Sequence, residues 1–597
     1  MSRDARSEPR SSDRGRLASA MRPWAGLATL AATTLLLVLV VPWFIPMRMQ
    51  AHASDSQLVG FNNRAAVVGL FLALILASVA GFAWRGGREM RSFVLRDRVD
   101  RTDRVPWWLV AFISAASVAI VVALGWTQRS FPVADDARYF ADRLLYLING
   151  GLPYRDFEFS YGPVLLYPQY LLWRAFAPLG VSPWAAYYAW LALTRIIGVL
   201  MLSFIVNRVR LPKHLRLALF AIIGAFAAWQ PSLGLNYSLL RFCTPFALIL
   251  LVMSLDYRHA GRHFVAVASL GAAVLAFAVS PEMGVAVAAA LVAAFGFTAI
   301  RADARDWWVV AALVGGAAVG AVVASGQSTF VSFLGGSDAF PILPGPPALV
   351  YILGALVLAM GAGAIMRTEH PSDAKPVLAW ATATLVLSMA ALGRADFGHI
   401  FWNGLGILIA VPAVLSDQRL NLARAYVIAA AAIFLSLLGL LTPFYVSQWR
   451  WSTAEQASQP SAEQISELVR APGVFAPMEP LRGPLGLALA ESHKLVSVFG
   501  TVTVDSLALR PGPVYLLYSQ SEYQSIYGPT VNPKPVSTAR APSYGSPYLS
   551  VLLGYPSQLA WRTSAPMTDA IAKADSVARS WVVVHQVFPS WVVLGKK

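Results

Sequence analysis

Two adjacent carboxylates, Asp135 and Asp136, lie near the start of the longest polar connection between apolar segments in the first 445 residues, Phe131 to Pro168. A carboxylate within reach of a hydroxyl can act as a general base, so the pair is a candidate for deprotonating an acceptor. Either Asp could instead cap a helix predicted over 137–148, a role worth about 1 kcal/mol. A helix cap accounts for only one of the two Asp residues, and the neighbour that it does not explain favours a catalytic base. We favour Asp135, which lies nearer the preceding apolar segment.

The same connection carries four further candidates, which are Arg138, Asp156, Glu158 and Tyr161. Asp156 and Glu158 are two residues apart, so they share one face if the chain is extended. Carboxylate oxygens suit a divalent cation such as Mg or Mn, so the two acids could be metal ligands as well as substrate-binding groups. A pair of solvated acids explains them equally well. Arg138 and Tyr161 are expected to bind substrate.

Three later connections carry polar groups that we also expect to bind substrate: Arg241 after Asn-Tyr-Ser, Glu282 in Ser-Pro-Glu-Met-Gly, and Arg394, Asp396 and His399 in Gly-Arg-Ala-Asp-Phe-Gly-His. An arginine presents a planar fork of donors and a histidine can donate or titrate, so both suit a phosphate. The alternative interpretations without a function are that Glu282 is a solvated residue at a helix end and that 394–399 is only a charged tight turn. Ionisable groups near membrane depth are costly, which favours function.

Composition indicates a membrane protein. The chain has 597 residues, of which 57% are hydrophobic and 13% charged, and apolar runs of about 20 residues recur along it. The net charge of +16 does not point to nucleic acid, because Lys and Arg sit in short loops between apolar runs. Cys243 is the only cysteine, which excludes an internal disulfide and a multi-cysteine metal site.

The charge pattern predicts about thirteen transmembrane helices with the N-terminus in the cytoplasm. The spans are 24–45, 63–84, 107–126, 184–206, 216–230, 239–256, 264–280, 283–300, 307–325, 348–366, 376–393, 400–415 and 425–445. Seven arginines between 85 and 104 assign that loop to the cytoplasm, so the large loop 127–183 faces outward. Within it, 164–176 is too short to span and is expected to lie along the outer surface. Arg195 falls inside a span and is expected to pair with a carboxylate or to belong to a lipid-phosphate site.

Three regions follow from this pattern. Residues 1–23 form a disordered basic cytoplasmic tail, 24–445 a transmembrane domain, and 446–597 a soluble extracytoplasmic α/β domain. About 150 residues suffice for one small domain. Strands are predicted at Val496–Phe499, Val514–Tyr518 and Trp581–Val584, and a helix at Met567–Ala578.

The motif of Asp-Asp, about a dozen residues, Gly-Gly-Leu-Pro-Tyr-Arg-Asp-Phe and then Tyr-Gly-Pro resembles membrane glycosyltransferases of the GT-C superfamily. Relatives include lipid A aminoarabinose transferases, protein O-mannosyltransferases and the group similar to rhizobial lipopolysaccharide core transferases. The resemblance covers roughly 107–415 and is strongest at 133–168. It implies a polyprenyl-phosphate sugar donor and an acidic base or metal ligand at Asp135 or Asp136. The loop 393–399 departs from the better-known members, so its roles rest on chemistry alone.

The expected function is therefore hexosyl or pentosyl transfer at the inner membrane, from a polyprenyl-phosphate donor to an acceptor hydroxyl on the extracytoplasmic side, in cell-envelope glycan, lipid or protein glycosylation. The resemblance implies an inverting displacement. Partners would be the donor, a lipid, glycan or protein acceptor, and membrane lipids, with no nucleic acid. The alternatives are a transporter or flippase of lipid-linked glycans, and a polymerase or ligase of surface polysaccharides. A transporter does not account for an acidic outer loop.

Overall fold

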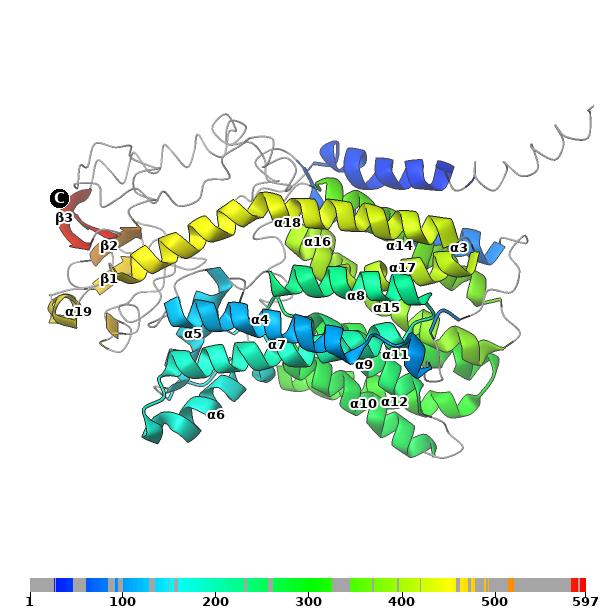
Figure 1. Ribbon diagram of the computed structural model, residues 1–597, viewed down its shortest axis with the longest axis horizontal. Coiled ribbons are helices and arrows are strands. Elements are labelled where there is room, and N and C mark those ends of the chain that lie inside the picture. The colour runs from blue at the N-terminus through cyan, green and yellow to red at the C-terminus, as the bar shows by residue number, and fades with distance from the viewer. Residues whose placement is uncertain are drawn as a thin grey trace, which may run out of the picture.

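The described residues are mostly helical and form a bundle of roughly parallel helices (Figure 1). This computed structural model describes residues 26, 28–46, 61–83, 92–94, 100–127, 135–148, 150–154, 159–229, 234–255, 261–324, 344–367, 370–394, 397–418, 420–457, 462–470, 474–477, 488–489, 492, 514–519, 581–588 and 591–596.

The bundle is built from these helices: Ala28–Trp43, α3 (Asn63–Ala83), α4 (Trp107–Thr127), α7 (Pro183–Arg208), α8 (Lys213–Ala228), α9 (Leu239–Met253), α10 (Arg262–Val279), α11 (Pro281–Arg301), α12 (Trp307–Ala324), α14 (Pro346–Ile365), α15 (Pro371–Arg394), α16 (Phe397–Asn403), α17 (Leu405–Gln418) and α18 (Leu420–Ala457). Eight are long and apolar enough to cross a membrane, or nine if the bent pair α16 and α17 forms one span. Each predicted span overlaps a described helix, except that 400–415 falls on two helices, α16 and α17, which are bent by 59° at their junction. How many of these helices cross the membrane stays a prediction.

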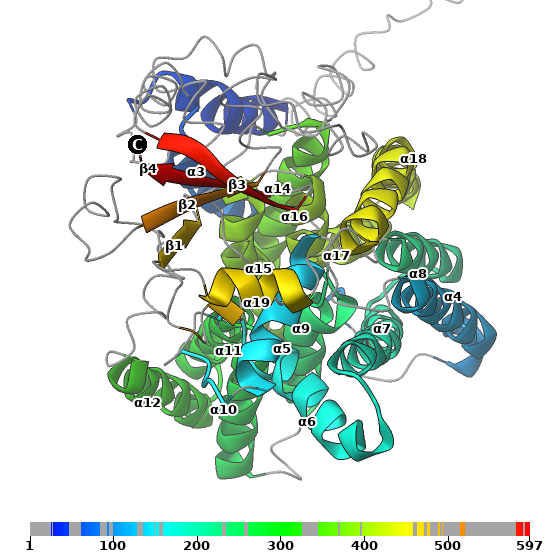
Figure 2. The same ribbon diagram turned by 90° about the vertical axis from the view of Figure 1, so that its left-hand side faces the viewer.

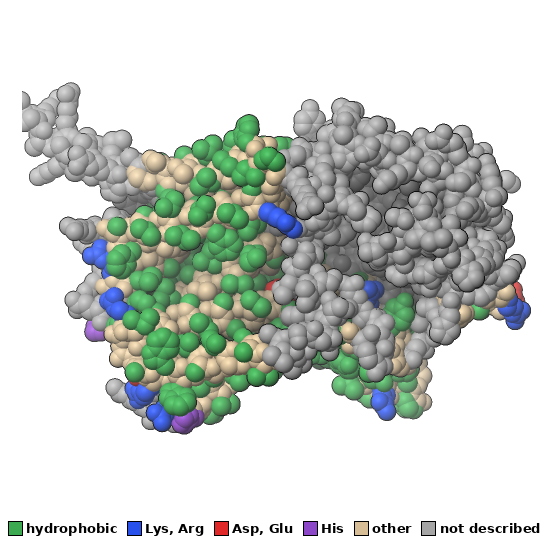
Figure 3. All heavy atoms as spheres, turned by 180° about the vertical axis from the view of Figure 1, so that it is seen from behind, with side chains coloured by type: hydrophobic (Ala, Val, Ile, Leu, Met, Phe, Trp, Pro, Cys, Tyr) green, Lys and Arg blue, Asp and Glu red, His purple; other side chains and the backbone are tan. Residues whose placement is uncertain are grey.

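The outside of the bundle is apolar, as a lipid-facing surface must be. Leu72, Phe112, Val267 and Ile428 are among many exposed large hydrophobic side chains. Hydrophobic side chains cover much of the described part of the face in Figure 3. Several Lys and Arg and the visible His lie along its left-hand edge, the end away from α5 (Asp135–Ile148), and further Lys or Arg lie near the middle and at the right-hand end. An apolar side of this kind is typical of a multi-pass membrane protein.

Glycines allow α3 and α14 to cross closely. A Cβ on Gly81 would overlap the carbonyl oxygen of Met360, and a Cβ on Gly363 would overlap that of Ser78. Close approach through small residues is how membrane helices gain packing energy, since lipid supplies no hydrophobic drive between them. Helix α3, which covers the second predicted span, is in this way packed onto the rest of the bundle.

A buried ion pair joins three helices at the end away from α5. Lys375 of α15 lies 2.7 Å from Asp306, just before α12, and Asp306 also accepts a hydrogen bond from Thr298 of α11. The Lys375 ammonium lies 4.2 Å from the ring centroid of Phe295. Helices α11 and α15 pack along their lengths, so this contact fixes one end of the pair whose other ends carry Glu282 and Arg394.

At the opposite end, shorter helices and a sheet follow the bundle. Helix α5 and α6 (Tyr167–Phe176) lie at the end where the strands also lie (Figures 1 and 2). Helix α6 falls within the predicted surface segment, and it is followed by Leu179, which is 77% exposed. An exposed apolar side chain there agrees with a helix lying at a lipid surface.

The C-terminal strands form one four-stranded sheet in the order β1-β2-β4-β3. Its strands are β1 (Val474–Pro477), β2 (Val514–Ser519), β3 (Trp581–Phe588) and β4 (Trp591–Lys596). The first two pair in parallel, and the other pairings are antiparallel. The strands predicted at 514–518 and 581–584 coincide with β2 and β3, whereas Val496–Phe499 and Met567–Ala578 lie outside the described residues. Helix α18 continues through the predicted boundary at 446 to Ala457, where α19 (Ala462–Arg470) follows.

Candidate functional site

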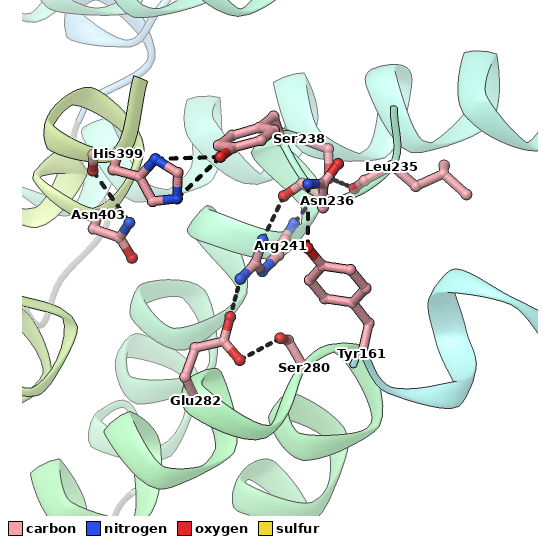
Figure 4. Close-up of polar contacts among 10 residues, drawn as sticks. Tyr161, Leu235, Asn236, Ser238, Arg241, Ser280, Glu282, His399 and Asn403 are labelled. Carbon is pink, nitrogen blue, oxygen red and sulfur yellow. Dashed lines mark hydrogen bonds and ion pairs between the residues drawn. The ribbon is translucent and has the colours of Figure 1, made fainter. Parts of the chain in front are cut away.

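An ion pair between Arg241 and Glu282 lies at the centre of the candidate site (Figure 4). Arg241 is in the first turn of α9, whose N-cap Ser238 accepts a hydrogen bond from the Arg241 backbone N–H at 3.4 Å. Glu282 is the second residue of α11, and Ser280 donates to its Oε2 at 2.5 Å. The two side chains are 11% and 18% exposed. Two helix starts are thus joined by one charged contact.

Each charge in this pair has further support. The guanidinium Nη1 donates to the Asn236 carbonyl at 2.9 Å, and Arg241 lies 4.8 Å from the Phe242 ring centroid. The carboxylate is at a helix N-terminus, where the macrodipole favours negative charge. The Nε of Arg241 is buried without a hydrogen-bond partner among the described residues. A buried donor of that kind calls for an acceptor, such as a ligand oxygen or a water.

Tyr161 connects this pair to the loop between α4 and α7. Its hydroxyl accepts a hydrogen bond from Asn236 Nδ2 at 3.2 Å, and the Arg241 guanidinium lies 4.9 Å from its ring centroid. Figure 4 shows Tyr161 reaching toward both residues from the loop. A cation at that distance from an aromatic face is stabilised by the ring quadrupole.

His399 joins the site from the far side through Tyr237. The Tyr237 hydroxyl lies 3.0 Å from Nε2 of His399 and 3.3 Å from Nδ1, and the two rings are edge to face at 86°. His399 is in the first turn of α16, which bends by 59° against α17. Asn403 donates to the His399 carbonyl at 3.1 Å, one turn later. The bent pair therefore brings an imidazole next to the segment that carries Asn236 and Arg241.

The described part of the loop between α4 and α7 is held by aromatic rings and includes one unusual backbone angle. Tyr154 has φ of 67°, a left-handed conformation that is uncommon for a non-glycine residue. Its hydroxyl donates to the Tyr161 carbonyl, and burial raises the pKa of that phenol, which keeps it a donor. Tyr139 of α5 accepts from the Ser160 N–H at 2.9 Å. Outliers that surrounding contacts hold in place cluster at functional sites.

Four of the predicted site residues come together in this arrangement: Tyr161, Arg241, Glu282 and His399. They come from four separate connections, as expected, although their roles stay predictions. Helix α5 begins at Asp135, two residues earlier than predicted, so Asp135 and Asp136 lie in its first turn and Arg138 follows. Arg394 ends α15. The side chains of these four residues, and the whole of Asp156, Glu158 and Asp396, lie outside the described part of the structure.

Arg195 makes a hydrogen bond to the backbone of a neighbouring helix, and its pairing with a carboxylate or a lipid phosphate stays a prediction. Its Nη1 donates to the Ala227 carbonyl at 2.7 Å, in the last turn of α8. With 16 residues, α8 is about 24 Å long and ends short of a full hydrocarbon core of about 30 Å. The arginine satisfies a carbonyl that has no partner within its own helix.

A metal site stays a prediction. Among the residues that the structure describes, no group of three or more His, Cys, Asp or Glu side chains is arranged to hold a metal ion. Asp156 and Glu158, the two predicted ligands, are not among them.

Four contributors to the site were missed by the sequence analysis, namely Tyr139, Tyr154, Ser280 and Asn403. Two of them could have been identified from the sequence. Ser280 precedes Pro281 at a helix start, and Asn403 follows His399 by four residues, which places it on the same helix face. Nothing local indicated that Tyr139 would meet Ser160 or that Tyr154 would adopt positive φ.

Comparison with known proteins adds structural similarity to a membrane protein of known structure. No protein-family model matches the chain, and no curated protein sequence matches it. The crystal structure of ArnT from Cupriavidus metallidurans bound to undecaprenyl phosphate matches 89% of this chain and 97% of its own, with 14% sequence identity and a TM-score of 0.34. ArnT is a lipid A aminoarabinose transferase, one of the groups that the sequence resembles. A TM-score this low does not establish a shared fold, so function is argued from this chain's own contacts.

Proposed function

We propose that this protein is an integral membrane glycosyltransferase. It moves a hexose or pentose from a polyprenyl-phosphate donor to an acceptor hydroxyl on the extracytoplasmic face of the inner membrane, in the formation of cell-envelope glycans, lipids or glycoproteins. The observation that carries this proposal is the connected group Tyr161, Asn236, Arg241 and Glu282, with Tyr237 and His399 beside it, at the end of an apolar bundle that also carries α5.

The donor is assigned from the chemistry of these groups. Its phosphate must stay at the bilayer surface, where the lipid tail remains in hydrocarbon and the sugar reaches water. Arginine donors stabilise the departing phosphate as charge develops on it. Arg241 has a donor to offer, because its Nε lacks a partner among the described residues. Arg394 and His399 come from the neighbouring connection and would bind the same phosphate.

The acceptor hydroxyl is assigned to the acids of α5. Asp135 or Asp136, in the first turn of that helix, would remove its proton as the bond between sugar and phosphate breaks. The new glycosidic bond forms from the acceptor oxygen on the opposite face of the sugar, so the sugar configuration inverts. The proton goes to the carboxylate, and the electron pair of the broken bond goes to the phosphate.

The test uses the full-length protein purified into lipid nanodiscs. A panel of polyprenyl-phosphate hexoses and pentoses, each labelled in the sugar, is supplied with lipid, glycan and peptide acceptors. We expect label to pass from one donor to one acceptor class, with polyprenyl phosphate released. Arg241→Gln should abolish transfer. Arg305→Gln, which removes an exposed arginine from an ion pair with Asp303 before α12, is the matched control and should keep it.

Two outcomes would replace this function. If the protein in liposomes moves a fluorescent lipid-linked glycan between leaflets without transferring sugar, it is a flippase. If it uses only oligosaccharides on polyprenyl pyrophosphate and transfers them whole, it is a polymerase or ligase.

A further inference from the structure

Tyr161 is held by contacts from three different elements. Its hydroxyl accepts from Asn236, which precedes α9, and its ring faces the Arg241 guanidinium. Its ring also stacks on Phe140 of α5, with centroids 5.3 Å apart and planes 26° apart. Phe140 is fully buried, so this stacking is part of a packed interior. A single side chain thus joins the loop, helix α5 and the buried ion pair.

The peptide unit that follows Tyr161 is held at both of its polar groups. Its N–H, that of Gly162, donates to the Val279 carbonyl at 3.1 Å, and a Cβ on Gly162 would overlap the Ala278 carbonyl. Its carbonyl, that of Tyr161, accepts a hydrogen bond from the hydroxyl of Tyr154, which is in a left-handed conformation. The position of Tyr161 relative to the end of α10 is therefore set by contacts of its own backbone.

We propose that Tyr161 is a positioning residue, which acts on the acid pair through α5 and not by binding substrate. Phe140 lies one helical turn after Asp136, so the stacked pair sets the height and rotation of the turn that carries both acids. The same ring sets the distance of that turn from Arg241. Because acceptor activation and phosphate binding must occur on one substrate, their separation controls the chemical step. This inference rests on the proposed function only for the roles of the acids and Arg241.

The kinetic test separates positioning from binding. Tyr161→Phe keeps the ring and loses the hydroxyl that contacts Asn236, whereas Tyr161→Leu loses the stacking and the cation contact too. For transfer, we expect kcat to fall about 10-fold in Tyr161→Phe and about 10²-fold in Tyr161→Leu, with donor KM within about 3-fold. Tyr170→Phe and Tyr170→Leu, on half-buried Tyr170 of α6, are matched controls that should retain kcat. An increased donor KM at unchanged kcat, or unchanged kinetics, overturns the proposal.

A second measurement does not depend on activity. Nitroxide labels at Arg143→Cys in α5 and Leu275→Cys on the exposed face of α10, in a Cys243→Ser background, report the distance between the two helices by pulsed electron resonance. We expect a narrow distribution that broadens or shifts in Tyr161→Leu and stays narrow in Tyr170→Leu. An unchanged distribution in folded Tyr161→Leu overturns the proposal, and Tyr161→Phe carries the test if the Leu variant does not fold. If the unsubstituted protein transfers no sugar, the proposed function fails, and this distance alone decides the positioning role.

Discussion

At the scale of single residues, the Arg241–Glu282 pair brings two charges together in a largely buried site and also joins two helices. Both side chains are largely buried, so their attraction must offset the loss of water around two charges. The hydrogen bonds from Ser280 to the carboxylate and from Arg241 to the Asn236 carbonyl supply part of that compensation. The pair also holds the starts of α9 and α11 together, so losing it changes structure as well as chemistry.

We therefore expect Glu282→Gln to destabilise the protein by about 3 kcal/mol, because Arg241 is left as a buried charge without its counter-charge. The double variant Glu282→Gln with Arg241→Gln removes both charges and should recover most of that loss. Thermal unfolding in nanodiscs measures both. A double variant no more stable than the single one would contradict the argument. Asp303→Asn breaks a more exposed pair and should change stability by less than about 1 kcal/mol.

For the two acids of α5, an effect on catalysis must be distinguished from an effect on folding. Asp135→Asn and Asp136→Asn should leave the protein folded, since Asn is tolerated at helix starts. If either Asp is the base, turnover should fall by about 10² to 10⁴-fold in that variant, with Asp135 the more sensitive position. Turnover is compared at equal amounts of folded protein. Full activity in both variants would move the search for the base to Glu282 and Asp396.

At the scale of elements, the contacts between helices depend on residues too small to attract notice in a sequence. Gly81 and Gly363 each leave no room for a Cβ against a carbonyl of the partner helix. By contrast, Gly271 in α10 faces open space. The two kinds of glycine look alike in the sequence, because each sits within a long apolar run.

Gly81→Ala should therefore lower the stability of the protein by about 1–3 kcal/mol, the usual cost of overpacking a fitted contact. Gly271→Ala should not lower it, because nothing lies within 4 Å of the added Cβ. Unfolding midpoints in one detergent compare the two variants directly. Equal losses in both would mean that helix propensity, and not the α3–α14 crossing, controls the response.

The positions of helices could be predicted from the sequence because a backbone in lipid must satisfy its own hydrogen bonds, which imposes long apolar runs. Contacts between residues that are distant in sequence could not be predicted in this way. Tyr237 and His399 are 162 positions apart, and their contact depends on the bend between α16 and α17. The positive φ of Tyr154 is equally hidden, because tyrosine is not a residue that signals a left-handed turn. Strand β4 was missed although it follows β3 after two residues, Pro589 and Ser590.

At the scale of the whole molecule, the two ends of the bundle differ in chemistry. One end carries the basic residues of the short connections, together with the buried contact between Asp306 and Lys375. The other carries α5, α6 and the strands. Because positive loops stay in the cytoplasm, we expect the end with α5 to face outward.

Cysteine labelling tests this orientation in a Cys243→Ser background. Ser130→Cys, before α5, should react with a membrane-impermeant maleimide on intact cells. Ala302→Cys, exposed in the turn between α11 and α12, should react only after the membrane is opened. The reverse pattern would invert the topology and remove the extracytoplasmic enzyme proposed above.

Helix α18 runs without a break for 38 residues, or about 57 Å, of which the hydrocarbon core needs only about 30 Å. Its length and pitch therefore set both the height and the direction of the chain that follows it. Each residue inserted in its outer half would lift the chain that follows by about 1.5 Å and turn it by about 100°. Two inserted residues would turn β1 and its partners to nearly the opposite side of the helix axis. Seven inserted residues, about two helical turns, would raise them by about 10 Å with almost no rotation. The part of the protein that follows α18 can therefore be raised without being turned only by insertions of about this length.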